Sequence, residues 1–505
     1  MFKRHGVAGA ILAIVLLVGV SAVGTGGAST GDTKRHLVVF AGDYAVDGTY
    51  AVDGGYAVLC NYAVLNGYAV GCNYAVAHDY AVSLVEAAGG TVANDMLSQI
   101  GVLSVDSSNA LFAQVLDASP VVAEVGEDFV WQGIPAAAPA AAPSGGGGPD
   151  AGEDLLEPQQ WSMQQINAPD AHAIQAGWDK VEVGILDSGI DGNHPDFKKN
   201  GVTNVDCTRE ESFTIVLSAP NCVDNQFHGT HVAGIVAARA NGLGVVGVAP
   251  NVTLIPVKVC DTSGYCYASA VTSGITYAAD QKFEVINMSL FVDDDQLLES
   301  TELKCMNDPV QRAFRRSVER AIQYARSQGV TPVAALGNSD LDLSDPPEPY
   351  ENQCEVVPAE SAGVIGTMAL GRDSEKASYS SYGNGATDVA APGGHGTTAD
   401  CTTTVLSTAP GDGYVCIQGT SMASPHTAGV AALIVSQYGK VGSDGDVKMS
   451  PTQVESYLQA STVDIGLPGY DECFGHGRIN ALRAVKHETA RVYDALAPFC
   501  PEYDE

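Results

Sequence analysis

Ser421 stands in a stretch whose residue types could support nucleophilic catalysis. The stretch runs from Gly419 to His426, and an apolar, alanine-rich run from Ala423 to Gln437 predicts a helix that begins close to the serine. Free N–H groups and the dipole at a helix N-terminus favour negative charge that develops beside such a hydroxyl. Because serine is a weak nucleophile at neutral pH, this chemistry also needs a base and a group that orients the base.

Two upstream motifs offer these partners. Asp187 follows an apolar run from Val181 to Leu186, which is typical of a buried parallel strand, and the carboxyl ends of such strands face the ligand crevice of open α/β sheets. His228 and His231 precede a small, apolar segment from Val232 to Ala240 that predicts a helix. Taken alone, the two histidines could equally form a metal pair or lie on the surface of a helix. The order Asp, His, Ser along the chain is that of subtilisin.

From about Trp161 to Val485 the chain resembles the subtilisin family of serine proteases, most specifically in the octapeptide around Ser421. The resemblance implies that Ser421 is the nucleophile, His228 the general acid and base, and Asp187 the group that orients the imidazole. It implies that Asn338, which ends the segment Ala334 to Asn338, donates to the oxyanion. The implied fold is a three-layer α/β/α domain with a mainly parallel central sheet.

The same resemblance assigns residues to substrate binding and to a structural calcium ion. The substrate-lining positions are Ser289, Leu290, Phe291, Ala335 and Gly337. The expected calcium ligands are the side chains of Asp196 and Asn241 and the carbonyls of Arg239, Leu243 and Val245, an oxygen set of the kind that calcium prefers. Glu157 could replace a glutamine of the family. Two family glycines are replaced here by Phe291 and Val292, which predicts a narrower groove.

Two acidic loops are expected beside this groove. One follows Val292 and the other follows Asn338, and both are rich in Asp and Glu. Clustered charge at a cleft predicts faster reaction with cationic peptides, most visibly at low salt. The alternative is that the loops only share the acidity of the whole chain.

The charge balance limits the classes of partner. The 505 residues include 59 acidic and 25 basic residues, a formal net charge of −34. This argues against binding to nucleic acid or to anionic membrane surfaces.

The N-terminus has the layout of a secretory signal peptide over residues 1–28, with a basic start, an apolar run from Val7 to Val23, and small residues after it. The alternative is an uncleaved membrane anchor. We expect a secreted, extracellular protein with no stable membrane insertion after removal of this segment.

Export is consistent with twelve cysteines. Neighbour pairing is expected rather than zinc binding, as Cys207 with Cys222, Cys260 with Cys266, Cys305 with Cys354, Cys401 with Cys416, and Cys473 with Cys500.

Residues 33–132 read as a small α+β unit that resembles the family's inhibitor prodomain, which would be an intramolecular partner of the protease. His36 to Phe40 predicts a strand and Ser83 the start of a helix. Between them, Tyr-Ala-Val recurs seven times at a six-residue spacing. A short β-solenoid is one interpretation, but an inserted segment at 44–82 is favoured, because 42 residues would form only about two coils.

The remaining boundaries follow from composition. An Ala-, Pro- and Gly-rich linker is expected at 133–158, the peptidase domain at 159–487 and an acidic tail at 488–505. The leading interpretation is a secreted serine endopeptidase that acts on peptides and proteins and is made as a self-processing precursor. The alternatives are a catalytically silent surface or interaction protein on the same fold, and a metal-dependent hydrolase that uses His228 and His231.

Overall fold

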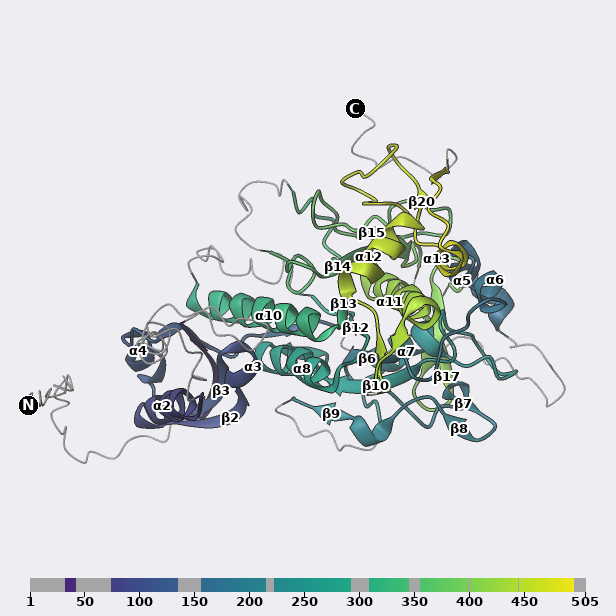
Figure 1. The fold of residues 1–505 in the computed structure, drawn as a ribbon. Coiled ribbons are helices and arrows are strands. Elements are labelled where there is room, and N and C mark those ends of the chain that lie inside the picture. The colour runs from purple at the N-terminus through teal and green to yellow at the C-terminus, as the bar shows by residue number, and fades with distance from the viewer. Residues whose placement is uncertain are drawn as a thin grey trace, which may run out of the picture.

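The computed structural model describes residues 32–41, 74–134, 156–214, 222–291, 308–344, 355–397, 400–443 and 445–494. Figure 1 shows an N-terminal unit, in purple and blue, beside a larger body that contains the remaining elements. The signal segment, most of the tyrosine repeats, most of the linker and the end of the acidic tail lie outside the described residues. Within them, no helix is long and apolar enough to cross a membrane.

The N-terminal unit is an antiparallel sheet with the strand order β2-β3-β1-β4. The elements of this unit are β1 (Lys34–Phe40), α2 (Tyr74–Ala87), β2 (Gly90–Met96), α3 (Leu97–Ile100), β3 (Val102–Ser107), α4 (Phe112–Asp117) and β4 (Val122–Glu127). Its core is apolar and includes Val38, Phe40, Leu103 and Phe112. This is the α+β pattern that the sequence predicts.

Helix α2 begins at Tyr74 rather than at Ser83, so the predicted helix start is wrong. Ala81, Val85 and Ala88 are all buried in the core of the N-terminal unit. Their spacing of four and three residues is the spacing of one helix face. The last tyrosine repeats, from Tyr74 on, therefore lie in this helix.

The larger body is built on a parallel sheet of seven strands in the order β15-β14-β13-β12-β6-β10-β9. Its strands are β6 (Glu182–Asp187), β9 (Glu211–Ser212), β10 (Thr253–Lys258), β12 (Val285–Met288), β13 (Thr331–Ala335), β14 (Ile365–Leu370) and β15 (Val389–Pro392). The four central strands β6, β12, β13 and β14 are almost fully buried, as expected for parallel strands that are covered on both faces.

Helices cover both faces of this sheet and create two cores. Helices α7 (His228–Ala237) and α11 (Thr420–Tyr438) pack on the face that receives Val183, Val285 and Val333. Helices α8 (Ala268–Gln281) and α10 (Pro309–Gln328) pack on the other face, with Leu186 and Ile286. Neighbouring residues of one strand enter opposite cores, as the pleat requires. This confirms the three-layer α/β/α fold.

Shorter elements surround the three layers. They are β5 (Val130–Gln132), η1 (Glu157–Gln159), α5 (Trp161–Gln165), α6 (Ala168–His172), η2 (Pro195–Phe197), β7 (Lys198–Lys199), β8 (Val202–Thr203), η3 (Cys207–Arg209), β11 (Tyr265–Tyr267), β16 (Val405–Ala409), β17 (Gly413–Ile417), β18 (Lys440–Val441), β19 (Val447–Lys448), α12 (Pro451–Ala460), β20 (Val463–Asp464), α13 (Ala481–Lys486) and β21 (Val492–Tyr493).

Three of the expected disulfides are present, Cys207–Cys222, Cys260–Cys266 and Cys401–Cys416. Cys473 is also disulfide-bonded, but Cys500 lies outside the described residues. The same holds for Cys305 and Cys354.

The N-terminal unit packs on the α8 and α10 side of the larger body (Figure 1). Strand β5, which follows it, pairs antiparallel with β11, so that Trp131 lies opposite Cys266. The chain that leaves the N-terminal unit therefore forms a strand that pairs with a strand of the larger body.

Candidate active site

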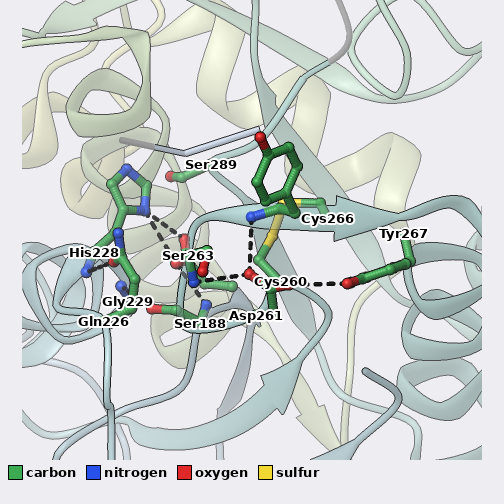
Figure 2. The surroundings of a disulfide bond; sticks show 12 residues. Ser188, Gln226, His228, Gly229, Cys260, Asp261, Ser263, Cys266, Tyr267 and Ser289 are labelled. Atoms are coloured by element: carbon green, nitrogen blue, oxygen red, sulfur yellow. Dashed lines mark hydrogen bonds and ion pairs between the residues drawn. A yellow bond between two sulfur atoms is a disulfide. The ribbon is translucent and has the colours of Figure 1, made fainter. Parts of the chain in front are cut away.

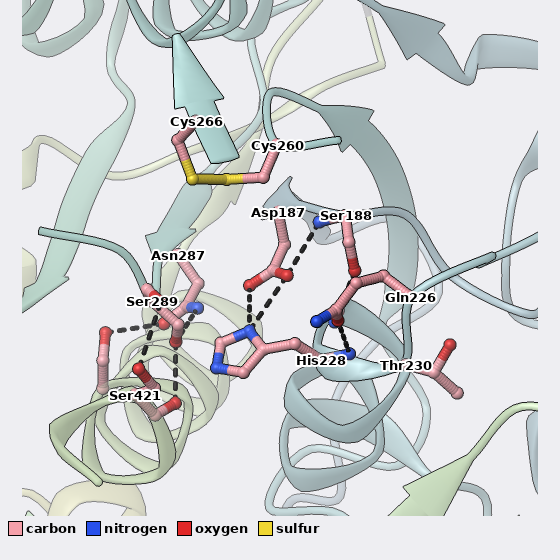
Figure 3. Close-up of polar contacts among 12 residues, drawn as sticks. Asp187, Ser188, Gln226, His228, Thr230, Cys260, Cys266, Asn287, Ser289 and Ser421 are labelled. Atoms are coloured by element: carbon pink, nitrogen blue, oxygen red, sulfur yellow. Dashed lines mark hydrogen bonds and ion pairs between the residues drawn. A yellow bond between two sulfur atoms is a disulfide. The ribbon is translucent and has the colours of Figure 1, made fainter. Parts of the chain in front are cut away.

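Asp187 and His228 form a buried hydrogen-bonded pair. Asp187 is the last residue of β6 and His228 the first residue of α7. Imidazole Nδ1 lies 2.9 Å and 3.0 Å from the two carboxylate oxygens of Asp187. Because an ionised carboxylate only accepts, Nδ1 is the donor, and Nε2 is left to act as the base. Figure 3 shows the imidazole between Asp187 and Ser421, with Nε2 on the side of Ser421.

The nucleophile candidate lies in the first turn of α11 and is anchored to the segment that follows β12. Ser289 Oγ donates to the Ser421 carbonyl at 2.8 Å, and Ser421 Oγ donates to the Ser289 carbonyl at 3.2 Å. His228 Nε2 is buried and has no hydrogen-bond partner among the described residues. The base is therefore free, whereas the serine hydroxyl is bonded to the Ser289 carbonyl and must turn toward Nε2 before it can react.

Asn338, which lies three residues beyond β13, is held in one orientation by Thr420. Its Oδ1 accepts from the Thr420 N–H and from Thr420 Oγ1, both at 2.9 Å. Since the amide oxygen is occupied, the Nδ2 group is the end that can donate to a substrate oxygen beside Ser421. Thr420 was not singled out from the sequence, although it directly precedes Ser421.

A further residue that sequence reasoning missed is Asp224, which joins the Asp187 and His228 segments. Its carboxylate accepts from Ser188 Oγ at 3.0 Å and from the N–H and hydroxyl of Thr230 at 3.0 Å and 2.7 Å. Burial raises the pKa of Asp224 above its ordinary value. The sequence shows an acidic residue four positions before the catalytic histidine candidate, but no local pattern indicates that this residue is buried.

His231 and His426 have structural contacts. His231 Nε2 lies 3.2 Å from the carbonyls of Val405 and Val415, and His426 Nδ1 lies 2.7 Å from the Met422 carbonyl. Burial lowers the pKa of His231 to about 3 and that of His426 to about 4. Both rings are therefore neutral at physiological pH. Because Nε2 of His231 donates to carbonyls, this nitrogen is not available to a metal ion.

The predicted substrate-lining residues lie on two segments that both contact the start of α11. Ser289 is bonded to Ser421, and the Gly337 N–H donates to Thr420 Oγ1 at 3.2 Å. Leu290 and Ala335 are fully buried, and Phe291 is 6% exposed. The structure thus brings Ser289 and Gly337 to the first residues of α11, and Phe291 lies beside Gly337.

Another edge of the site is formed by the loop that carries β11. The N–H groups of Val259 and Cys260 donate to the Asp187 carbonyl at 2.9 Å and 3.3 Å. The Cys260–Cys266 disulfide closes this loop, and Figure 2 shows it in the neighbourhood of His228 and Ser289. Asp261 holds the loop from inside, because its carboxylate accepts from Ser263 N–H, Tyr265 N–H and the Tyr267 hydroxyl. The edge strand is therefore fixed next to the Asp187–His228 pair.

The residues predicted to bind calcium also converge. The Val245 N–H donates to Asp196 Oδ2 at 2.9 Å, and the Arg239 N–H donates to the Asp196 carbonyl at 2.7 Å. The Asn241 amide donates to the carbonyls of Pro195 and Lys198, and its Oδ1 accepts from Leu243. Asp196 is fully buried. Within the described ranges, no group of three or more His, Cys, Asp or Glu residues forms a metal cluster.

Two side chains of the acidic loops that are expected beside the groove form ion pairs with basic residues of the same chain. Asp340 forms an ion pair with Lys376, and Glu355 forms one with Arg315 at 2.5 Å. Asp342 is described as well, and its carboxylate accepts from the backbone and hydroxyl of Ser344. The other acidic residues of these loops, apart from Asp308 at the start of α10, lie outside the described residues.

Comparisons with known proteins agree with this arrangement. Residues 179–477 match the family model described as the subtilase family. Alkaline elastase YaB of Bacillus sp. (strain YaB) is 32% identical over 337 residues, which cover 67% of this chain and 73% of that protein. Subtilisin DY of Bacillus licheniformis is 36% identical over 306 residues, which cover 61% of this chain and 91% of that protein.

Solved structures show the same fold. A lanthipeptide protease is 27% identical with a TM-score of 0.55, covering 66% of this chain and 95% of its own. The epidermin leader peptide processing serine protease of Staphylococcus aureus is 20% identical with a TM-score of 0.64, covering 90% of this chain and 98% of its own. The site is that of a serine-type endopeptidase. The chain belongs to the subtilase family.

Proposed function

We propose that this chain is a secreted serine endopeptidase that is made as an inhibited precursor and removes its own prodomain. The observation that carries the proposal is the hydrogen-bonded Asp187–His228 pair, whose free Nε2 lies on the side of Ser421. Secretion is supported by the layout of residues 1–28 and by the disulfides.

In the proposed mechanism, His228 Nε2 takes the proton of Ser421 Oγ as the oxygen attacks the peptide carbonyl. Asp187 keeps the imidazole in the tautomer with the proton on Nδ1 and stabilises the imidazolium. The Nδ2 group of Asn338 and the N–H of Ser421 stabilise the oxyanion. His228 then gives its proton to the leaving amine, and water hydrolyses the acyl-enzyme by the same steps in reverse.

The prodomain is proposed to inhibit the site through its docked tail. Asp128 accepts from the N–H and Oγ of Ser269 at the start of α8, at 2.8 Å and 2.5 Å. Strand β5 then runs antiparallel to β11, from Tyr267 to Tyr265, and the Ile134 N–H donates to the Gly264 carbonyl beyond it. The tail thus runs toward Cys260, whose N–H donates to the Asp187 carbonyl. The tail pairs with the edge strand β11. An extended peptide substrate could pair with the same strand, so the docked tail would exclude it. Ser421 is only 5% exposed.

Calcium is proposed as a structural cofactor. The residues present fit such an ion, because they offer carboxylate, amide and carbonyl oxygens, the donor set that calcium prefers. The Val245 N–H is bonded to the carboxylate of the buried Asp196, and the Arg239 N–H is bonded to the Asp196 carbonyl. Leu156, next to Glu157, also approaches this loop through its N–H bond to Gly244. The ion would stabilise the segment between β6 and α7 and takes no part in the proposed reaction.

One experiment tests this proposal against a catalytically silent protein on the same fold. Full-length chains with Ser421 or with Ser421→Ala are expressed, and their masses and N-termini are compared. The parent should lose its prodomain, and the Ser421→Ala chain should keep it. A purified Ser421→Ala chain that trims its own prodomain would contradict the assignment.

A further inference from the structure

We propose that Phe291 restricts the enzyme to substrates with a small side chain on the residue whose carbonyl is attacked. This inference rests on the proposed function, because it concerns the specificity of that same site. It depends on where Phe291 lies relative to Gly337 and Ser421.

Two backbone segments flank the nucleophile and define the space for this side chain. The first is Ser289 to Phe291, which is fixed to Ser421 by the two hydrogen bonds between Ser289 and Ser421. The second is Gly337 with Asn338, which is fixed to Thr420. A carbonyl that is attacked by Ser421, with its oxygen toward Asn338, directs the side chain of the same residue between these two segments.

Phe291 closes this space. One ring carbon, Cδ2, lies 3.6 Å from the position that a Cβ on Gly337 would occupy, which is ordinary van der Waals contact. The ring therefore lies against a residue without a side chain, directly before Asn338. It is 6% exposed and belongs to the hydrophobic cluster that includes Leu290, Ala335 and Leu336. Because neighbours in a close-packed cluster leave little free volume, a large substrate side chain cannot enter unless the ring moves.

The sequence of the expected maturation region is independently consistent with this restriction. Residues 136–149 contain only Ala, Pro, Ser and Gly. A self-processing enzyme that cuts in this linker must accept a small residue before the bond. The proposed pocket and the chain's own linker therefore require the same substrate class.

The test uses peptides that differ only in the residue before the cut, which is Ala, Leu or Phe. The full chain is expressed as the parent, Phe291→Ala, Phe291→Leu and Phe213→Ala. The control residue Phe213 is a partly buried phenylalanine next to β9, 6.0 Å from Tyr277 between ring centroids. Rates are divided by the fraction of each protein that a fluorophosphonate labels, so that differences in folding or processing do not affect the comparison of the variants.

For the parent, we expect kcat/KM to be at least about 10-fold and up to about 200-fold higher with Ala than with Phe before the cut. Phe291→Ala should remove or invert this ratio, Phe291→Leu should give an intermediate ratio, and Phe213→Ala should keep the parental ratio. A parent that prefers Phe or Leu, or a Phe291→Ala ratio equal to that of the parent, would overturn the inference while leaving the protease assignment intact. A parent that is neither labelled nor active on any peptide would overturn the proposed function as well.

Discussion

Trp131 should hold the prodomain tail in the substrate groove, and its removal should open the groove. Trp131 is 3% exposed, lies opposite Cys266 in the β5–β11 pair, and has ring centroids 5.1 Å from Phe314 and 5.7 Å from Phe129. Truncation of a packed Trp to Ala costs about 3–5 kcal/mol. Since about 1.4 kcal/mol corresponds to a factor of ten, Trp131→Ala should weaken docking of the tail by about 10²-fold to about 4 × 10³-fold.

The assay uses the full chain with Ser421→Ala, in which no cleavage should change the sample. A fluorescent peptide that binds in the groove competes with the tail, so its apparent affinity reports how often the groove is open. Trp131→Ala in this background should tighten peptide binding toward the predicted factor. Val130→Ala is the matched control, because Val130 is on the same strand but is 43% exposed. Equal peptide binding by the Trp131→Ala chain and its parent, or an equal effect of Val130→Ala, would refute the reasoning.

Three further predictions concern the calcium site, the docked prodomain tail and Asp224. Excess calcium should raise the Tm, because a ligand present at 100 times its Kd stabilises the folded state by about 2.7 kcal/mol. An equal rise in the Asp196→Ala/Asn241→Ala double variant would count against the site. Burial of Asp128 at the docking interface raises its pKa from 3.8 to about 6, so the docked tail holds a proton more tightly than the free tail. Docking should therefore be strongest below about pH 4 and weaken up to about 10²-fold as the pH rises to about 6. Asp128→Asn should flatten this profile, and an unchanged slope in the peptide-binding assay would contradict it. Asp224→Ala should lower the free energy of unfolding, because it leaves Ser188 and Thr230 donors buried without an acceptor at about 1–3 kcal/mol each; denaturant unfolding that matches the parent would exclude this role.

The sequence was most informative where a local pattern carries the structure. The apolar run that ends in Asp187, and the helices that follow His228 and Ser421, are visible as short continuous segments, and β6, α7 and α11 contain them. Three disulfides joined the neighbours that spacing suggested. In each case the residues concerned are close in the chain or belong to a single element.

Contacts between distant segments could not be predicted in the same way. The pairing of β5 with β11 joins residues more than a hundred positions apart, and neither strand is long enough to show a period. Asp224 and Thr420 became recognisable only when the loops before α7 and α11 were folded against β6 and β13. The start of α2 was missed because repeats with a six-residue spacing hide the helical stripe that Ala81 shares with Val85.

The most direct test of the account is whether Ser421 alone reacts as an activated nucleophile. A fluorophosphonate probe is added to the active protein, and the labelled peptide is identified by mass spectrometry. We expect one label per active molecule on Ser421, no label in Ser421→Ala, and much slower labelling in His228→Ala. Labelling at another residue, or at Ser421 with a rate that is unchanged in His228→Ala, would contradict it.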